Sequence, residues 1–120
     1  MLVMDTGTPE AAAALKKYGA AVTAMLKHLL FLEKIWSQVL RGERRRVNHR
    51  NACTSRTLEE ELFRASVAAT ELRQGIELTK ESYGEQDAAR LRVLDVTFET
   101  VMRQWSDFTK RLRKILDRSG

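Results

Sequence analysis

The stretch LKKYGAAVTAMLKHLLFLEKIWSQV, residues 15–39, decides the fold of this chain. Its apolar residues recur at alternating steps of three and four, which is the spacing of a helix that buries one seam against its neighbours. A strand that buries one face alternates at every second residue, so this spacing excludes a sheet here. The seam consists of Leu15, Tyr18, Val22, Met25, Leu29, Leu32, Trp36 and Val39. We therefore predict a long amphipathic helix.

Two further seams with the same spacing follow along the chain. They consist of Leu58, Leu62, Ala65, Ala69, Leu72, Ile76, Thr79 and Tyr83, and of Leu91, Leu94, Phe98, Val101, Trp105, Phe108, Leu112 and Ile115. Only Thr79 among the 24 seam residues is not apolar, whereas a composition with 43% hydrophobic residues gives roughly ten apolar residues by chance. The seams predict an all-α fold, an antiparallel three-helix bundle with heptad (coiled-coil-like) packing and both tryptophans in its core.

Capping residues give the expected bounds of the first helix. Thr8 is an N-cap residue, and Pro9 after it suits the first helical position. Gly42 can adopt the left-handed conformation that closes many helices. The first helix is therefore expected over about 9–41.

The other two helices are expected over about 58–83 and 87–117. Thr57 and Glu60 have the spacing of a capping box, in which the hydroxyl and the carboxylate each satisfy a free backbone amide at the start of a helix. This start leaves a basic loop over 42–56. The seam changes register between the second and third helices, which indicates a short turn and antiparallel neighbours.

The length and the composition predict one domain over residues 1–120. The only cysteine is Cys53, so no disulfide can form within the chain and a reducing compartment is expected. No signal peptide and no apolar run of about 20 residues, the length of a membrane span, is found. We expect a cytoplasmic protein. The nucleus is the alternative, because the arginine run of the loop and the segment 110–114 resemble nuclear-import signals.

The excess of positive charge is concentrated in one segment. The chain has 21 Lys and Arg against 16 Asp and Glu, and residues 41–56 contain six arginines and a single acid, Glu43. The remainder of the chain has 15 basic and 15 acidic residues. Candidate anion-binding or nucleic-acid-binding residues are therefore Arg44, Arg45, Arg46 and Arg50, which would attract nucleic acid or an anionic membrane surface. A solvated connector between helices also tolerates arginine. Binding of nucleic acid or an anionic membrane surface through the arginine-rich loop 41–56 is therefore the alternative function.

The sequence lacks the patterns that catalysis or metal binding requires. His49 and Cys53 are four residues apart, but structural zinc needs four ligands and no second pair accompanies them. The Glu-x-x-His pairs of di-iron bundles, a phosphate-binding glycine loop and a Gly-x-Ser-x-Gly motif are absent. We therefore expect no enzyme activity, no cofactor and no metal ion.

Several apolar residues lie away from the seams, on the sides that a three-helix bundle turns outward. They are Leu30, Phe31, Phe63, Val67, Val93 and Val96. They either widen the buried stripe of each helix or form a surface for a partner. Exposed apolar pairs at helical spacing favour a groove for a partner helix or a face for a homo-oligomer. The leading hypothesis is therefore a protein-interaction or adaptor domain.

Overall fold

The all-α prediction is confirmed by a computed structural model, which describes residues 8–43 and 48–119. The chain forms α1 (Pro9–Leu40), α2 (His49–Thr79), a short 3-10 helix η1 (Lys80–Ser82) and α3 (Glu85–Ser119). No strand occurs within these described ranges. The protein is a three-helix bundle.

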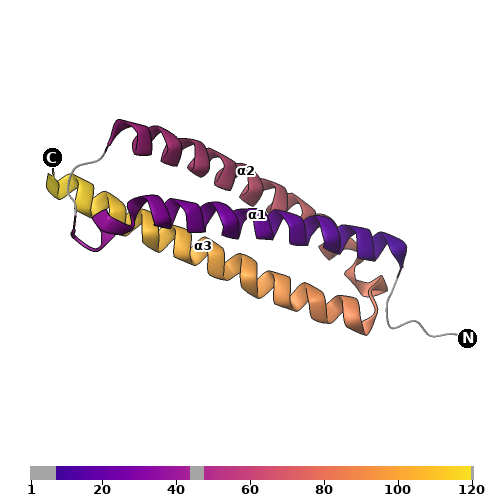
Figure 1. Ribbon diagram of the computed structural model, residues 1–120. Helices are drawn as coiled ribbons and strands as arrows, with labels where there is room; N and C mark the ends of the chain where they lie inside the picture. Colours follow the sequence, from indigo (N-terminus) through magenta and orange to yellow (C-terminus); the bar gives the residue numbers. More distant parts are fainter. Residues whose placement is uncertain (1–7, 44–47, 120) are drawn as a thin grey trace, which may run out of the picture.

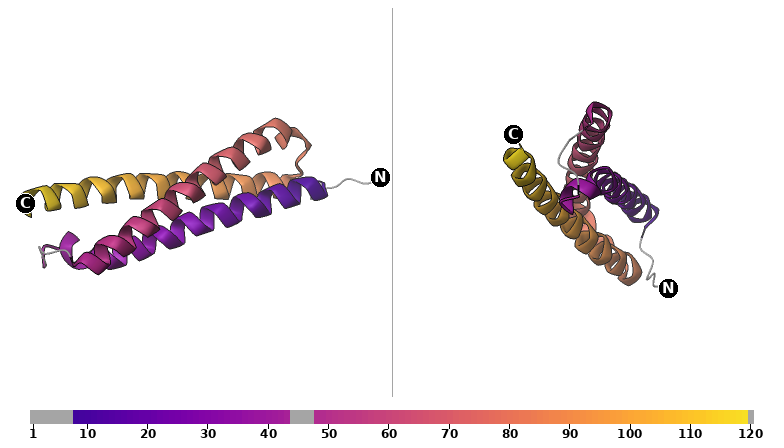
Figure 2. Two further views of the ribbon diagram at one scale, coloured as in Figure 1. Left: turned by 90° about the horizontal axis from the view of Figure 1, so that it is seen from above. Right: turned by 60° about the vertical axis from the view of Figure 1, so that its left-hand side comes forward.

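The three helices form a rod with α1 in the middle. Its extents are 66 × 20 × 19 Å. Figure 1 shows that α1 and α3 run in the same direction and that α2 runs antiparallel to both. α1 packs against both other helices, whereas the backbones of α2 and α3 make almost no close approach to each other. α2 and α3 are joined through η1 at one end and lie apart at the other (Figures 1 and 2).

Both ends of α1 are capped as predicted. The Thr8 hydroxyl oxygen accepts a hydrogen bond from the Ala11 backbone N–H at 3.1 Å, and a proline occupies the first turn. Gly42 has a φ of 75°, and its N–H donates to the carbonyl of Val39 at 3.0 Å. A positive φ is strained for residues with a Cβ, which explains the glycine at this position.

The predicted start of the second helix is wrong. α2 begins at His49 instead of residue 58, so much of the predicted basic loop 42–56 is helical. Asn48 is the N-cap. Its side-chain oxygen accepts hydrogen bonds from the backbone N–H groups of Arg50 at 2.8 Å and Asn51 at 3.2 Å. This cap satisfies the free amides of the first turn.

Thr57 lies inside α2 and caps nothing. Its hydroxyl donates to the carbonyl of Cys53, one turn earlier, at 3.2 Å. The spacing of Thr57 and Glu60 therefore resembles a capping box without being one. The residues before Thr57 include arginine and alanine, which are good helix formers, so the helix extends back to the earlier cap.

The turn between the second and third helices is also displaced from its predicted position. α2 ends at Thr79 instead of residue 83, η1 follows, and α3 begins at Glu85 instead of residue 87. The turn is short, as predicted, and it makes α2 and α3 antiparallel.

The seams are buried to different degrees. All eight seam residues of α1 are buried, whereas the seams that begin at Leu58 and Leu91 mix buried with half-buried residues, and Thr79 is exposed. The two tryptophans show this difference. Trp36 on α1 is 4% exposed, as predicted, but Trp105 on α3 is only half-buried against the core. The prediction for Trp105 was thus only partly correct, because α2 does not close over this side chain.

Candidate functional site

All six predicted partner-binding residues are exposed, but they do not form one surface. Leu30 and Phe31 lie on α1, Phe63 and Val67 on α2, and Val93 and Val96 on α3. Phe63 and Val93 line hollows in two different grooves of the bundle. A single binding surface therefore includes only some of them.

Phe63 faces the groove between α2 and α3. It is 60% exposed and lines a hollow together with Trp105 of α3. The other lining residues are Arg56, Glu59, Glu60 and Arg64, all from α2. Two aromatic side chains from different helices therefore meet at a surface that water reaches.

Met102 extends this apolar surface along α3. It is 37% exposed and lies seven residues, or two helical turns, after Asp95, which contacts α2. Residues seven apart share one side of a helix, so Met102 is also on the side of α3 that faces α2. Val67 is 40% exposed and follows Phe63 by four residues, so it lies beside Phe63 on α2. We use the name α2/α3 face for the surface formed by Phe63, Val67, Met102 and Trp105.

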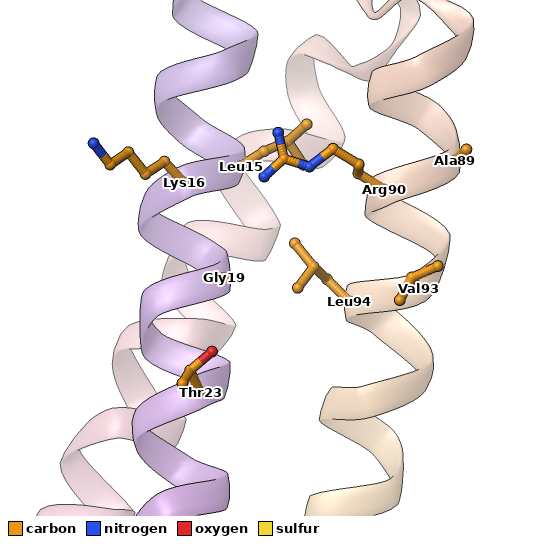
Figure 3. A pocket seen from close by; sticks show the side chains of 8 residues that line it. All are labelled: Leu15, Lys16, Gly19, Thr23, Ala89, Arg90, Val93 and Leu94. Carbon is orange, nitrogen blue, oxygen red and sulfur yellow. The ribbon is translucent and has the colours of Figure 1, made fainter.

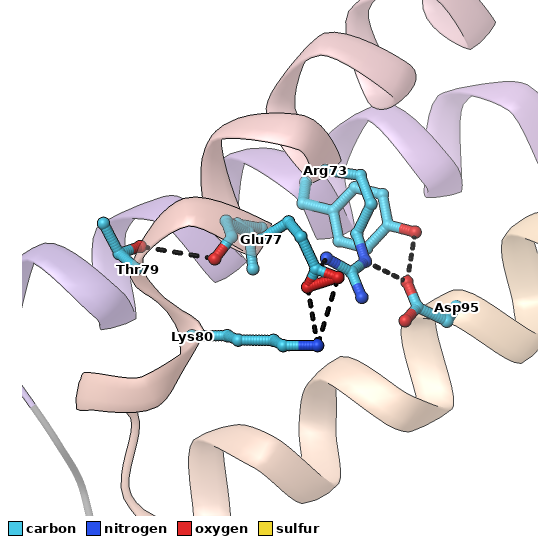
Figure 4. Close-up of polar contacts among 7 residues, drawn as sticks. Arg73, Glu77, Thr79, Lys80 and Asp95 are labelled. Atoms are coloured by element: carbon cyan, nitrogen blue, oxygen red, sulfur yellow. Dashed lines mark hydrogen bonds and ion pairs between the residues drawn. The ribbon is translucent and has the colours of Figure 1, made fainter.

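A polar junction of Tyr18, Arg73 and Asp95 joins the three helices. Figure 4 labels its Arg73 and Asp95. The Tyr18 hydroxyl donates to Asp95 Oδ1 at 2.7 Å, and Arg73 Nε donates to the same oxygen at 2.8 Å. The Tyr18 ring also packs edge-on against Phe98, with ring centroids 6.2 Å apart. The junction ties α2 to α3 near the end that η1 connects.

The environment of the junction shifts the pKa values of its members. Burial, followed by the hydrogen bond and the charge of Asp95, raises the pKa of the Tyr18 phenol well above its usual range. The hydrogen bond to Asp95 also raises the pKa of the Arg73 guanidinium. Tyr18 therefore stays neutral and Arg73 stays charged, which maintains both hydrogen bonds over a wide pH range.

Two glutamates of α2 flank the α2/α3 face. Glu77 lies 2.7 Å from Lys80 and 3.7 Å from Arg73, and the hydrogen bond from Lys80 lowers the pKa of the Glu77 carboxyl. Burial raises the pKa of the Glu59 carboxyl. The Glu77 carboxylate at the connected end of the face is thus engaged in ion pairs within α2 and η1.

A second hollow lies between α1 and α3 and includes the predicted residue Val93 (Figure 3). Leu15, Gly19 and Leu94 form its apolar floor. A Cβ on Gly19 would lie 3.6 Å from the Leu94 side chain, so the two helices approach closely here. The Arg90 side chain extends from α3 towards α1 across this hollow. The Arg90 side chain therefore covers part of this hollow.

The predicted anion-binding arginines are only partly described. Arg44, Arg45 and Arg46 lie outside the described residues, and Arg50 is exposed in the first turn of α2. Arg41 forms an ion pair with Glu43 at 3.0 Å. The fold also places the C-terminal part of α3, with the basic segment 110–114, at the same end of the rod as this region.

His49 and Cys53 lie one helical turn apart, with His49 Nε2 and Cys53 Sγ separated by 3.6 Å. Within the described residues, no group of three or more His, Cys, Asp or Glu side chains is placed to hold a metal ion. No helix in the described part of the chain is long and apolar enough to cross a membrane.

Asp95, Met102 and Trp105, like Arg73, were not predicted as site residues from the sequence. Asp95 and Met102 lie just beside the seam of α3, where a heptad pattern does not predict their contacts. The one available signal was Tyr18, because a tyrosine on a buried seam needs a hydrogen-bond partner for its hydroxyl. Nothing in the heptad pattern distinguished Trp105 from Trp36.

No protein-family model, curated protein or solved structure matches this chain. Its function must therefore be inferred from the geometry of its own surfaces.

Proposed function

We propose that this protein is a non-enzymatic interaction or adaptor domain whose α2/α3 face binds an amphipathic helix, either of another protein or of a second copy. The observation that supports this proposal is the position of Phe63, Met102 and Trp105. All three contribute exposed apolar surface along the groove where the two helix backbones diverge.

A helix laid along this groove would complete the packing that α2 and α3 do not provide for each other. Burying apolar surface yields about 25 cal/mol per Å², and a fully buried large side chain contributes roughly 1.5–3 kcal/mol. Aromatic residues near the centre of an interface commonly supply most of its binding energy. Phe63 and Trp105 are therefore the expected anchors.

The charged residues beside the face support a structural role. Asp95 is bonded to both Tyr18 and Arg73, and Glu77 is paired with Lys80. Asp95 thereby positions the helices that it joins, because one of its oxygens accepts from both donors. A binding function is consistent with such an arrangement.

The proposal can be tested by pull-down from nuclease-treated lysate. The variant Phe63→Asp with Val67→Asp should lose the proteins that the wild-type chain captures, because two charges would be buried in the contact. Val93→Asp with Val96→Asp is a matched control, since it places the same charges at exposed positions of another surface. Unchanged capture by the first variant, with its fold intact by circular dichroism, would contradict the proposal.

A second candidate function is the binding of nucleic acid or an anionic membrane surface at one end of the rod. The supporting observation is that the fold brings Arg41, Arg50 and Arg56 to the same end as the segment 110–114. Such binding releases counterions and weakens steeply as salt rises. A titration at low and high salt tests it, with Arg44, Arg45, Arg46 and Arg50 changed to Ser. A response that does not depend on salt, or no loss in this variant, would exclude the candidate.

A further inference from the structure

We propose that the occupant of the α2/α3 face is a second copy of this chain, packed antiparallel about a two-fold axis that crosses the rod at mid-length. The inference rests on the proposed function, because it uses the same face and names what covers it. Three features of the structure support it: where the apolar residues lie, how charge is distributed along the rod, and the size of the side of the rod that carries the face.

The apolar residues of the face lie at the middle of the rod. The midpoint of α2 is Arg64, and Phe63 and Val67 are within three residues of it. The midpoint of α3 is Met102 itself. In a two-fold dimer the same patch contacts itself, so that patch must lie on the axis. A two-fold axis perpendicular to the rod at this point therefore brings these residues of the two copies into contact. The copies then lie side by side over their full lengths.

Charge differs between the two halves of the rod. The half formed by residues 25–43, 48–64 and 102–117 has eleven basic and seven acidic side chains, a net charge of +4. The half formed by residues 8–24 and 65–101 has six basic and eight acidic side chains, a net charge of −2. Antiparallel copies place the positive half of one beside the negative half of the other, whereas parallel copies place like charges together.

One line of residues on α2 repeats this polarity locally. Arg56, Phe63, Thr70 and Glu77 are seven residues apart and therefore share one side of the helix. Arg56 and Phe63 line one hollow between α2 and α3, and Glu77 lines the other. A two-fold axis between Phe63 and Thr70 sets Arg56 of one copy opposite Glu77 of the second copy. The arrangement is self-complementary only when the helices run antiparallel.

The side of the rod that carries the α2/α3 face is large enough for a stable dimer. A standard interface covers about 800 Å² on each partner. A rod 66 Å long and 20 Å wide presents a larger side than this. Lengthwise overlap can therefore supply the area, whereas contact through one end of the rod cannot.

Two other positions on α2 provide the decisive experiment. Cys53 is the only cysteine and is exposed, and Val67 lies two heptads after it on the same side of the helix. We would compare the wild-type chain with a variant carrying Cys53→Ser and Val67→Cys, each treated with a short bis-maleimide cross-linker. In the proposed dimer the introduced thiols of the variant adjoin the axis, whereas the two Cys53 residues of the wild type are about 40 Å apart, given a rise of 1.5 Å per residue.

The expected result is a cross-linked dimer from the Val67→Cys variant and none from the wild-type chain. Cross-linking of both would indicate parallel copies and would overturn the proposal. Cross-linking of neither, with a monomeric mass by sedimentation, would also overturn it. Salt provides a second readout, because the Debye length falls from about 10 Å at 0.1 M to about 3 Å at 1 M, so the dimer should dissociate more readily at high salt.

Variants from both helices separate loss of the dimer from loss of the fold. Phe63→Asp on α2 and Met102→Asp on α3 should each yield a monomer with an unchanged circular dichroism spectrum, since both side chains are exposed in the single chain. A chain that stays monomeric, but whose capture of another protein depends on Phe63 and Val67, would refute the second copy and leave the proposed function standing. A chain that neither dimerises nor captures another protein through Phe63 and Val67 would refute both the second copy and the proposed function.

Discussion

The two sides of this bundle differ in how completely the helices cover each other. α1 lies between the other helices and buries all eight of its seam residues, including Trp36. α2 and α3 each pack well against α1 but hardly against each other, and Trp105 remains half-buried between them. The same heptad spacing thus gives a closed contact where a helix has two neighbours and an open one where it has a single neighbour.

A seam therefore specifies the direction of burial without specifying its extent. The buried side of α1 is a continuous row of seam residues. The gap between α2 and α3 is bridged by Asp95 at the connected end, whereas at mid-length it is lined by Phe63 and Trp105 with charged residues of α2 beside them. Stability should therefore depend chiefly on α1, and recognition chiefly on the pair that flanks it.

The largest effect is expected from Leu29→Ala in the seam of α1. Leu29 is fully buried, so the substitution leaves a cavity and should lower the free energy of unfolding by about 2–5 kcal/mol. Urea denaturation followed by circular dichroism measures this loss. A loss below that range would mean that α1 is less tightly enclosed than the structure shows.

A smaller loss is expected from Asp95→Ala at the polar junction. The substitution removes the acceptor shared by Tyr18 and Arg73 and leaves the buried Tyr18 hydroxyl without its partner, at a cost of about 1–3 kcal/mol. Asp107→Ala on the same helix is the control, because its side chain is exposed. Equal unfolding free energies for the two variants would show that the junction contributes nothing.

The stability of the bundle should fall at high pH because of Tyr18. Its pKa is raised in the folded state from the ordinary value of 10.0, so its contribution is complete below about pH 10 and is lost as the pH rises above that value. Tyr18→Phe should reduce this decline. In a Tyr83→Phe background Tyr18 is the only tyrosine, so phenolate absorbance reports its ionisation directly. Ionisation near pH 10 in the folded protein would contradict the assigned environment.

The smallest effect is expected from Leu78→Ala, the exposed counterpart of the first substitution. Leu78 is 87% exposed near the end of α2, so removing its side chain should change the unfolding free energy by less than about 0.5 kcal/mol. The same urea experiment measures it. Equal changes in unfolding free energy for Leu29→Ala and Leu78→Ala would contradict the assignment of Leu29 to the core and Leu78 to the surface.

Much of the fold could be predicted because its signals are local. The seam of α1, its Thr8 cap and its Gly42 terminus each depend on a few residues with defined chemistry, and each is confirmed. The start of α2 was wrong because two segments compete as caps. Thr57 has the right spacing, but Asn48 satisfies the first amides of a longer helix.

The surface between α2 and α3 could be predicted only in part. Exposure of Phe63 and Val67 followed from their position opposite the seam. The contribution of Trp105 did not, because it depends on the distance between two helices that are connected only at one end. The partner of Tyr18 was likewise hidden, since Asp95 is 77 residues away in the chain.

The order of the helices along the chain matters for synthesis, because the central element is made first. α1 and α2 can pair as a hairpin while α3 is still being translated. Until Asp95 and Phe98 leave the ribosome, the flank of α1 around Tyr18 lacks its final covering. A nascent chain halted before residue 85 would therefore display an apolar strip of the kind that chaperones bind.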